Sequence, residues 1–264
     1  MERMRKSRVL NGLRAGRPVL NFKINLADAR VCDLAAMMGF DCLWLDMEHV
    51  ANDWSTIEEQ VRAAKVHDVD AMVRVARGSY SDFIRPLELD ATGIMVPHIL
   101  SLADARNVIR MTRFHPVGRR PVDGGNADGG YANIDFVEYI RQANENRFVV
   151  LQIEDPEPLD ELEAIAALEG YDVLFFGPGD FSHGIGAPGD FSHPKVIDAR
   201  KRVAEAALRH GKFAGTTTPI DGVGEMLALG YRFLSVGADV LGLSQYCRAL
   251  VENWKKTIRK EKKA

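Results

Sequence analysis

Two carboxylates stand where they could hold a divalent cation. Gln152 and Glu154 lie two residues apart in the apolar run 148–154, so their side chains project to the same face of a strand. Asp180 comes directly after the next apolar run, 173–179. If these runs are neighbouring parallel strands, both carboxylates reach one edge and can share an ion. Carboxylates with water and substrate oxygens suit Mg²⁺, Mn²⁺ or Co²⁺, whereas zinc usually recruits more His or Cys.

The same carboxylates also have a purely structural interpretation. Glu154 and Asp180 both precede segments with helical spacing, so each could cap a helix or pair with an arginine. The residues alone leave the metal site and the structural interpretation open.

A histidine and an arginine are further candidates for chemistry. His49 follows Asp46 and Glu48 at the end of the apolar run 42–48, where an imidazole could act as a general acid or base. A surface or capping role is the alternative. Arg74 lies inside another apolar run, and a buried guanidinium needs an anionic partner. A substrate carboxylate, a substrate enolate or an internal salt bridge would each satisfy it.

The elements that must position these residues recur along the chain. Short apolar runs alternate with segments of helical spacing, and the runs are rich in the residue types of strands buried on both faces. Eight such units predict a single (β/α)₈ TIM barrel over residues 1–264, with a doubly wound open sheet as the alternative. The open sheet is disfavoured because no glycine-rich turn follows the first run. The eight runs are 19–25, 42–48, 71–77, 93–99, 148–154, 173–179, 212–218 and 233–239.

Three local features of this barrel can also be predicted from the sequence. The irregular segment 115–133 is long for a compact domain, and we expect it to fold over the barrel mouth after the fourth βα unit. A helix is expected to begin at Ser55, with Glu58 completing a capping box. Gly170, Gly211 and Gly230 should end helices just before the following strands.

Composition sets limits on partners and location. A net charge of −3 gives no general attraction to nucleic acid or membrane. No apolar stretch approaches the roughly 18 residues of a membrane span. Three cysteines without CxxC spacing fit neither a disulfide framework nor a zinc site, so a cytoplasmic location is expected.

Several of these segments together are similar to a known family. The chain resembles, over roughly residues 10–250, the HpcH/HpaI aldolases, which are class II metal-dependent pyruvate aldolases. The Q-x-E and G-P-x-D segments are the most specific part of the likeness. The resembling segments are GFDCLWLDMEHVAND (39–53), AMVRVARG (71–78), LELDATGIMVPHI (87–99), VVLQIED (149–155), GYDVLFFGPGDFSHGIG (170–186) and FLSVGADV (233–240).

The resemblance implies a carbon–carbon lyase that cleaves a 4-hydroxy-2-oxo acid, or a 2-keto-3-deoxy sugar acid, to pyruvate and an aldehyde through a metal-stabilised enolate. It implies Glu154 and Asp180 as ligands of Mg²⁺, Mn²⁺ or Co²⁺, and Arg74 as the donor to the keto oxygen. It further implies His49 as the acid or base and Asp90 as the carboxylate that orients it. The pyruvate pocket would be lined by Gln152, Gly177, Pro178 and Gly179. No lysine is expected at a strand end, and no Schiff base is required.

Alternatives to this reaction stay open. The same enolate site would serve an oxaloacetate decarboxylase, and a non-catalytic dicarboxylate-binding relative is a third hypothesis. The segment 115–133 departs from the family pattern, so the acceptor aldehyde is not specified. The resemblance also implies a homo-oligomer, a hexamer built as a trimer of dimers. In it the apolar C-terminal helix, about residues 241–258, would pack on a neighbour.

Overall fold

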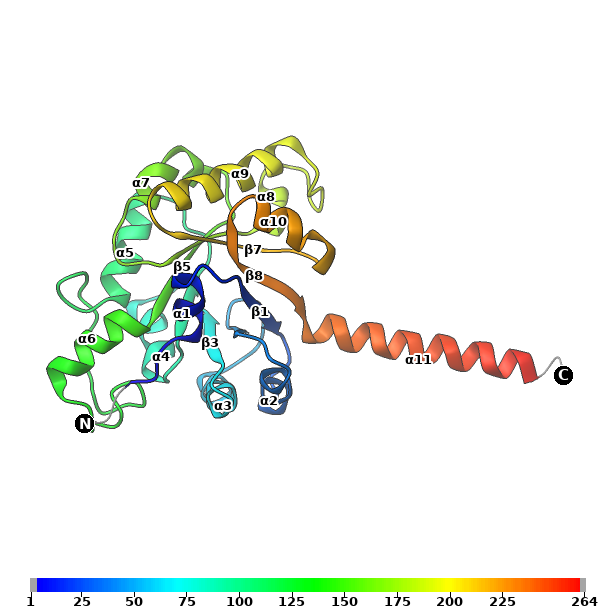
Figure 1. The fold of residues 1–264 in the computed structure, drawn as a ribbon, viewed down its shortest axis with the longest axis horizontal. Helices are drawn as coiled ribbons and strands as arrows, with labels where there is room; N and C mark the ends of the chain where they lie inside the picture. Colours follow the sequence, from blue (N-terminus) through cyan, green and yellow to red (C-terminus); the bar gives the residue numbers. More distant parts are fainter. Residues whose placement is uncertain (1–3, 262–264) are drawn as a thin grey trace.

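The computed structural model describes residues 4–261, and its eight strands close into one parallel barrel (Figure 1). Neighbouring strands pair in chain order, and the first strand pairs with the last, so the (β/α)₈ prediction is confirmed and an open sheet is excluded. The strands are β1 (Val19–Ile24), β2 (Cys42–Asp46), β3 (Asp70–Arg74), β4 (Gly93–Val96), β5 (Phe148–Ile153), β6 (Val173–Phe176), β7 (Phe213–Thr217) and β8 (Tyr231–Ala238).

Helices surround the barrel because the outer faces of the strands are as apolar as the inner ones. Every residue of β5 is buried, since one face meets the barrel interior and the other meets helices. Short 3₁₀ turns cover Glu157–Asp160 and Ile220–Gly222. The helices are α1 (Arg8–Arg14), α2 (Ala29–Met37), α3 (Trp54–Val66), α4 (Tyr80–Glu88), α5 (Leu102–Thr112), α6 (Phe136–Asn146), α7 (Leu162–Ala166), α8 (Pro178–Gly184), α9 (Pro194–Arg209), α10 (Val223–Ala228) and α11 (Asp239–Glu261).

Aromatic side chains fill the lower part of the barrel interior. The Phe175 ring lies 5.8 Å from the Trp44 ring and 6.2 Å from the Phe233 ring, centroid to centroid. Gly93 makes room for this layer, because a Cβ there would lie 2.3 Å from a ring carbon of Phe148. The lower part of the interior is therefore a packed, mainly apolar core.

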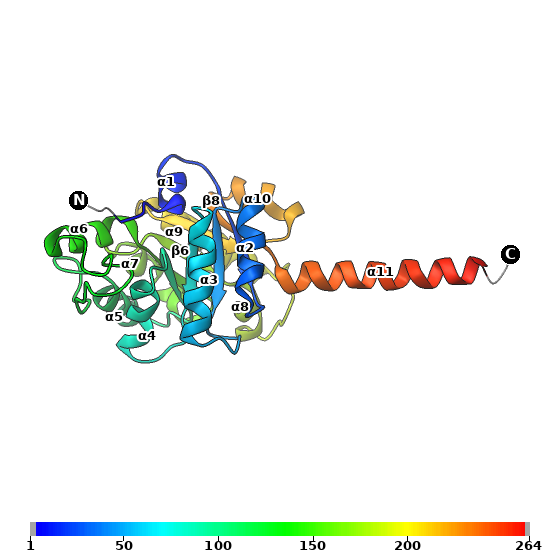
Figure 2. The ribbon, with the colours of Figure 1, turned by 90° about the horizontal axis from the view of Figure 1, so that it is seen from below.

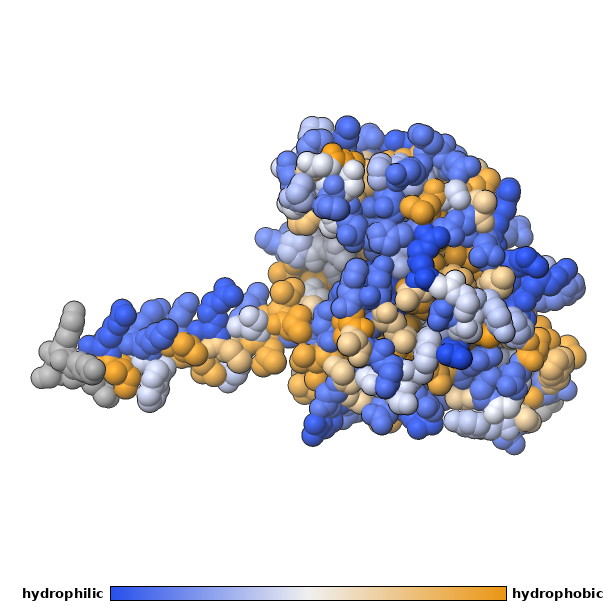
Figure 3. Space-filling view, turned by 180° about the vertical axis from the view of Figure 1, so that it is seen from behind, coloured by the Kyte–Doolittle hydropathy of each residue, from blue (hydrophilic) through white to orange (hydrophobic). Residues whose placement is uncertain are grey.

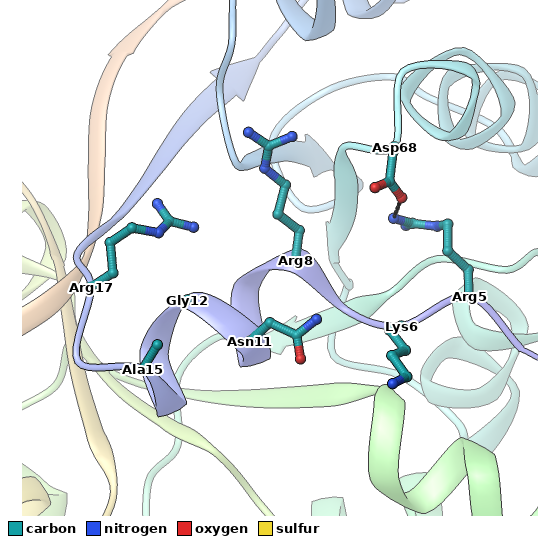
Figure 4. Close-up of a pocket in the computed structure, with 8 residues that line it drawn as sticks. All are labelled: Arg5, Lys6, Arg8, Asn11, Gly12, Ala15, Arg17 and Asp68. Atoms are coloured by element: carbon teal, nitrogen blue, oxygen red, sulfur yellow. Dashed lines mark hydrogen bonds and ion pairs between the residues drawn. The ribbon is translucent and has the colours of Figure 1, made fainter.

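Helix α1 closes the opposite end of the barrel, where the strands begin. Val9 and Leu10 join the interior core, and Val9 N–H donates to a carboxylate oxygen of Asp70 at 2.9 Å. A surface cavity of about 580 Å³ surrounds this helix, and Figure 4 shows four cationic side chains along it, those of Arg5, Lys6, Arg8 and Arg17.

The helix starts and ends predicted from capping residues in the sequence are found in part. The expected start at Ser55 is wrong: α3 begins one residue earlier, because Asp53 accepts a hydrogen bond from Thr56 N–H at 2.8 Å and caps it. Gly211 and Gly230 adopt positive φ directly after the C-caps of α9 and α10, as predicted. Gly170 also has a positive φ before β6, but the prediction that it ends a helix is wrong, because α7 ends at Ala166.

The long segment between α5 and α6 does not cover the mouth, which corrects the sequence-based expectation. It lies at the amino end of the barrel, because it follows α5 and leads through α6 to the start of β5. Asp128 in this segment contacts the guanidinium of Arg147, the residue before β5, at 2.7 Å. Asp128 N–H also donates to the carbonyl of Glu88 at the end of α4.

The last helix leaves the barrel. In two perpendicular views α11 projects away from the other elements over most of its length (Figures 1 and 2). Asp239 anchors its first turn by accepting the N–H groups of Asn25 and Leu26 at 2.9 Å each, just after β1. Within residues 4–261, no helix combines the length and the apolar character needed to cross a membrane.

Candidate active site

The polar residues selected from the sequence, except Asp90, gather at the carboxyl ends of β2 to β6. Asp46 and Arg74 are the last residues of β2 and β3, and they lie opposite one another in the strand register. Gln152 is in β5, and Glu154 comes directly after it. The structure thus brings the residues that follow one set of strand ends to one mouth, as this fold requires.

Arg74 is held by an internal salt bridge. Its side chain is buried, its Nε donates to Asp46 Oδ1 at 3.0 Å, and its guanidinium stacks 4.7 Å above the Trp44 ring. Its Nη1 lies 2.9 Å from Glu48 Oε2. Burial alone would raise the pKa of Asp46, but hydrogen bonds and charge from Arg74 and Lys23 outweigh burial and hold that pKa at about 2. Arg74 is therefore rigid and still has N–H donors for a ligand.

Three side chains converge beside this pair. Ligand atoms of Glu48, His98 and Glu154 all lie within 4.8 Å of one another. His98 Nε2 is 3.6 Å from Glu48 Oε1 and 3.9 Å from Glu154 Oε1. Its Nδ1 is 2.8 Å from Asp155 Oδ2, so this carboxylate fixes the ring with Nε2 facing the group. His98 adopts a φ of 50°, a strained conformation for a non-glycine residue that occurs often at functional sites.

Glu154 is poorly compensated as a buried anion. Its pKa is raised to about 7: burial is the largest cause, and the nearby charges of Glu48 and Asp180 act in the same direction, while a hydrogen bond from His98 N–H at 3.0 Å and the His98 charge oppose them. Burial lowers the pKa of His98, but contact with Asp155 and the charges of Glu154 and Glu48 outweigh it, so that pKa lies above its usual value. A carboxylate in this setting gains from a bound cation.

The residues around Glu154 form a close-fitting cradle. Gln152 Nε2 donates to Glu154 Oε2, and Gln152 Oε1 is buried with no hydrogen-bond partner among residues 4–261. At Gly177 a Cβ would lie 2.6 Å from Glu154 Oε2 and 2.9 Å from Gln152 Nε2, so only glycine fits there. Asp180 is exposed in the first turn of α8, and its charge reaches Glu154. Between Gly177 and Asp180 in the chain, Pro178 is buried and Gly179 is exposed.

His49 and Asp90 are not brought together. His49 lies at the mouth, with its side chain 55% exposed and its Nε2 3.5 Å from Glu48 Oε2. Asp90 lies at the other end of the barrel, three residues before β4, and its carboxylate pairs with Lys65 and Arg147. The expected pairing is therefore wrong within one chain, where Asp90 does not orient His49. Residues that precede a strand lie at the amino end of the barrel, opposite the site.

The sequence analysis missed two features of the site. Lys23 is at the end of β1 and points into the barrel, where its Nζ lies 2.9 Å from Asp46 Oδ2 and 5.1 Å from the Trp44 ring centre. The alternation with Val19 and Asn21 could have revealed its inward orientation. The convergence of Glu48 and His98 with Glu154 was also missed, because it depends on side-chain offsets between neighbouring strands.

The cavity around α1 is not a competing active site. Arg5 lies 3.1 Å from Asp68 and 3.0 Å from Asp70, and the first of these contacts is drawn in Figure 4. Arg8 and Arg17 lie 3.0 and 2.9 Å from Asp41. These cations are largely neutralised by carboxylates of the chain itself.

Comparison with known proteins agrees with this geometry. Residues 22–245 match the family model of the HpcH/HpaI aldolase/citrate lyase family. A hydroxypyruvate/pyruvate aldolase of Pseudomonas aeruginosa is 33% identical over 92% of this chain and 91% of its own length. A 5-keto-4-deoxy-D-glucarate aldolase of Klebsiella pneumoniae is 31% identical over 88% of this chain and 90% of its own.

A solved structure agrees as well. The HpcH/HpaI aldolase of Desulfitobacterium hafniense superposes with a TM-score of 0.88 at 28% identity, covering 94% of this chain and 96% of that one. The chain belongs to the HpcH/HpaI aldolase/citrate lyase family and is a carbon–carbon lyase.

Proposed function

We propose that this chain is a metal-dependent aldolase that reversibly cleaves a 4-hydroxy-2-oxo acid, or a 2-keto-3-deoxy sugar acid, to pyruvate and an aldehyde. The observation that supports this best is the buried, poorly compensated Glu154, which faces Glu48 and His98 beside the fixed guanidinium of Arg74. The curated relatives described above are aldolases of oxo acids, which is consistent with the same reaction class.

Glu154 and Asp180 would hold the cation, with Glu48 within reach. His98 Nε2 faces the same group and would donate a hydrogen bond to a carboxylate oxygen of Glu48 or Glu154. An all-oxygen ligand set fits Mg²⁺, Mn²⁺ or Co²⁺. When bound, such an ion supplies Lewis-acid polarisation of the keto and carboxylate oxygens of the 2-oxo acid.

The other residues bind the reacting groups and move protons. Arg74 has five N–H donors, of which contacts to Asp46 and Glu48 use three, so two remain for a keto oxygen that becomes an enolate oxygen. Gln152 Oε1 and the backbone from Gly177 to Gly179 would line the pyruvate end. His49, exposed at the rim, would transfer the proton of the 4-hydroxyl group as the carbon–carbon bond breaks.

Dependence on a divalent metal tests this proposal. Chelator-treated protein should lose pyruvate-forming activity and regain it with Mg²⁺, Mn²⁺ or Co²⁺, because carboxylates alone cannot stabilise an enolate. Borohydride with pyruvate should leave Lys23, the lysine beside Asp46, unmodified. A trapped lysine adduct together with activity that resists chelation would contradict the metal-dependent mechanism.

An oxaloacetate decarboxylase would use the same enolate site, but no contact among the described residues favours it over the aldolase. Assays with oxaloacetate and with a 4-hydroxy-2-oxo acid separate the two reactions. Turnover of oxaloacetate alone would replace the aldolase assignment.

We further propose that the protein is a cytoplasmic homo-oligomer, a hexamer, in which α11 packs on a neighbouring copy. One side of this projecting helix is apolar (Figure 3), and a single helix without partners is marginal in water. On the barrel itself, Leu20 of β1 is 38% exposed. A monomeric mass by light scattering at micromolar concentration would contradict the oligomer. The exposed apolar residues of α11 are Leu241, Leu243, Tyr246, Leu250, Val251 and Trp254.

A further inference from the structure

The turn between β4 and α5, residues 97–101, borders the proposed cation site, and we call it the β4–α5 turn. His98 lies in this turn with a φ of 50°, a left-handed conformation that costs free energy for a residue with a Cβ. In this conformation its N–H donates to Glu154 Oε1 at 3.0 Å, and its Nε2 lies 3.6 Å from Glu48 Oε1. A strained backbone persists only where surrounding contacts hold it, so the contacts that hold His98 bear on the site.

The segment that carries Glu154 supplies two of these contacts. Ile99 N–H donates to the carbonyl of Gln152 at 3.1 Å, and His98 Nδ1 lies 2.8 Å from Asp155 Oδ2. Both partners belong to β5 or follow it directly. These contacts therefore hold the β4–α5 turn from the β5 side only.

Arg77 holds the turn from the other side. It lies in the connection between β3 and α4, and its Nη1 donates to the backbone carbonyl of His98. Its Nη2 lies 2.7 Å from Asp104 Oδ2 in the first turn of α5, and the same oxygen accepts Leu100 N–H at 3.1 Å. Because β4 lies between β3 and β5, the β4–α5 turn is held by the connections on both of its sides.

The ion pair of Arg77 and Asp104 can contribute little to the stability of the barrel. The Arg77 side chain is 36% exposed, and exposed ion pairs add little to the free energy of unfolding. The charge of Arg77 would also disfavour a cation at the mouth, because like charges repel. Any gain in cation affinity from Arg77 must therefore come from geometry.

We propose that Arg77 is a positioning residue that, together with Asp104, holds His98 in its left-handed conformation. In that conformation His98 keeps the carboxylates of Glu154 and Glu48 in the arrangement that receives the ion. This inference rests on the proposed function, because the cation site is the one proposed there. Groups that orient metal ligands from behind contribute about 10- to 100-fold to metal affinity or activity.

Direct binding of Mn²⁺ tests this role without turnover. Unbound Mn²⁺ has an electron paramagnetic resonance signal that is lost on binding, so a titration gives the dissociation constant. Arg77→Met should weaken binding about 10-fold, whereas loss of a positive charge alone would strengthen it. Its melting temperature in chelator should stay within about 2 °C of wild type. Arg77→Lys should recover part of the affinity, because an ammonium can reach the carbonyl but lacks the planar fork.

A matched control removes an equal charge elsewhere. Arg62 pairs with Glu58 on the exposed face of α3 and makes no printed contact with the β4–α5 turn, so Arg62→Met changes charge without changing the turn. Its affinity for Mn²⁺ should stay within about twofold of wild type, since exposed charges are screened.

A second pair of variants tests the backbone of His98. His98→Gly and His98→Ala both lack the ring, but only glycine adopts a positive φ without steric cost. His98→Gly should therefore bind Mn²⁺ about threefold or more tighter than His98→Ala. Equal affinities in these two variants would show that the left-handed conformation does not matter to the ion, and the proposal would fail.

The other outcomes separate this inference from the proposed function. Affinity in Arg77→Met that equals or exceeds that of wild type overturns the role of Arg77, and so does an equal loss in Arg62→Met. A wild type that binds no Mn²⁺ overturns the cation site and this inference together. Weakened binding in Arg77→Met, in a protein that cleaves no 4-hydroxy-2-oxo acid, supports the role of Arg77 and overturns only the proposed reaction.

Discussion

The two ends of the barrel each hold a cluster of buried charges, and the clusters differ in balance. At the amino end, Asp128 lies 2.9 Å from Arg120 and 2.7 Å from Arg147, and Arg147 also pairs with Asp90. Burial raises the pKa of Asp128, but the two arginines outweigh burial and hold that pKa below its usual value. At the mouth, Glu154 has no such compensation, and its pKa rises to about 7.

This difference distinguishes a structural cluster from a functional one. A buried carboxylate whose charge is balanced by arginines of its own chain holds a loop in place and needs no bound ligand. A buried carboxylate that faces other carboxylates is a candidate for binding a cation or a proton. The two clusters should therefore respond in opposite ways to mutation.

The largest effect is expected at Arg74. Arg74→Ala should reduce both deuterium exchange into pyruvate and carbon–carbon cleavage by about 10³ or more, since one oxyanion donor contributes about 10²–10³ and orientation is lost as well. Arg74→Lys should recover little, because an ammonium cannot keep the two bonds to Asp46 and also reach Glu48. Rates are measured at saturating Mg²⁺, with the fold verified by circular dichroism. Near-wild-type exchange in Arg74→Ala would remove the arginine from the mechanism.

Mutation of the amino-end cluster should lower stability and leave activity nearly unchanged. Asp128→Asn removes the carboxylate paired with Arg120 and leaves Arg147 with Asp90 alone, so the free energy of unfolding should fall by about 3–5 kcal/mol. Activity per folded molecule should change by less than about threefold. Asp123→Asn, in the same segment but exposed, is the control and should stay within about 0.5 kcal/mol. Chemical denaturation measures both, and equal loss in the two variants would contradict a special role for the cluster.

The pH dependence of Asp128 has a definite sign. Its folded pKa is lower than its unfolded pKa, so its contribution to stability is fully present above about pH 4 and is lost as pH falls through the folded value. The difference in free energy of unfolding between wild type and Asp128→Asn should therefore become smaller in acid.

A smaller effect is expected at His49. His49→Ala should lower cleavage by roughly 10², at the lower end of the range for general acid–base catalysis, because the side chain is largely exposed. Exchange into pyruvate needs no aldehyde, so it should fall less than in Arg74→Ala. Deuterium uptake and aldol turnover are compared in the same preparations. Equal and complete loss of exchange in His49→Ala and Arg74→Ala would contradict separate roles for the two residues.

The sequence predicted the barrel because eight apolar runs alternate with helical spacing, and local sequence dominates that pattern. It also placed Gln152 and Glu154 correctly on one face, since strand alternation is local. It misplaced Asp90 and the segment 115–133, although both could have been located by asking whether each precedes or follows a strand. It could not predict that His98 and Glu48 meet Glu154, because that depends on the stagger between strands far apart in the chain.

The smallest effect concerns the stability of metal-free protein. Because the folded pKa of Glu154 is raised to about 7, the folded state holds this proton more tightly than the unfolded chain does. Stability in chelator should therefore fall as pH rises from about 4.5 to about 7, and then level off.

Glu154→Gln keeps the size of the side chain and removes its charge. At pH 8 in chelator this variant should be more stable than wild type by about 3 kcal/mol, the order of magnitude that a rise in pKa from 4.5 to about 7 represents. Adding Mg²⁺ should reverse the order, because only the wild type gains binding free energy on folding. Glu157→Gln, at an exposed position nearby, should behave as wild type in both conditions. A Glu154→Gln protein less stable than wild type in chelator would show that the mouth is as well balanced as the amino end, and the argument for a cation there would fail.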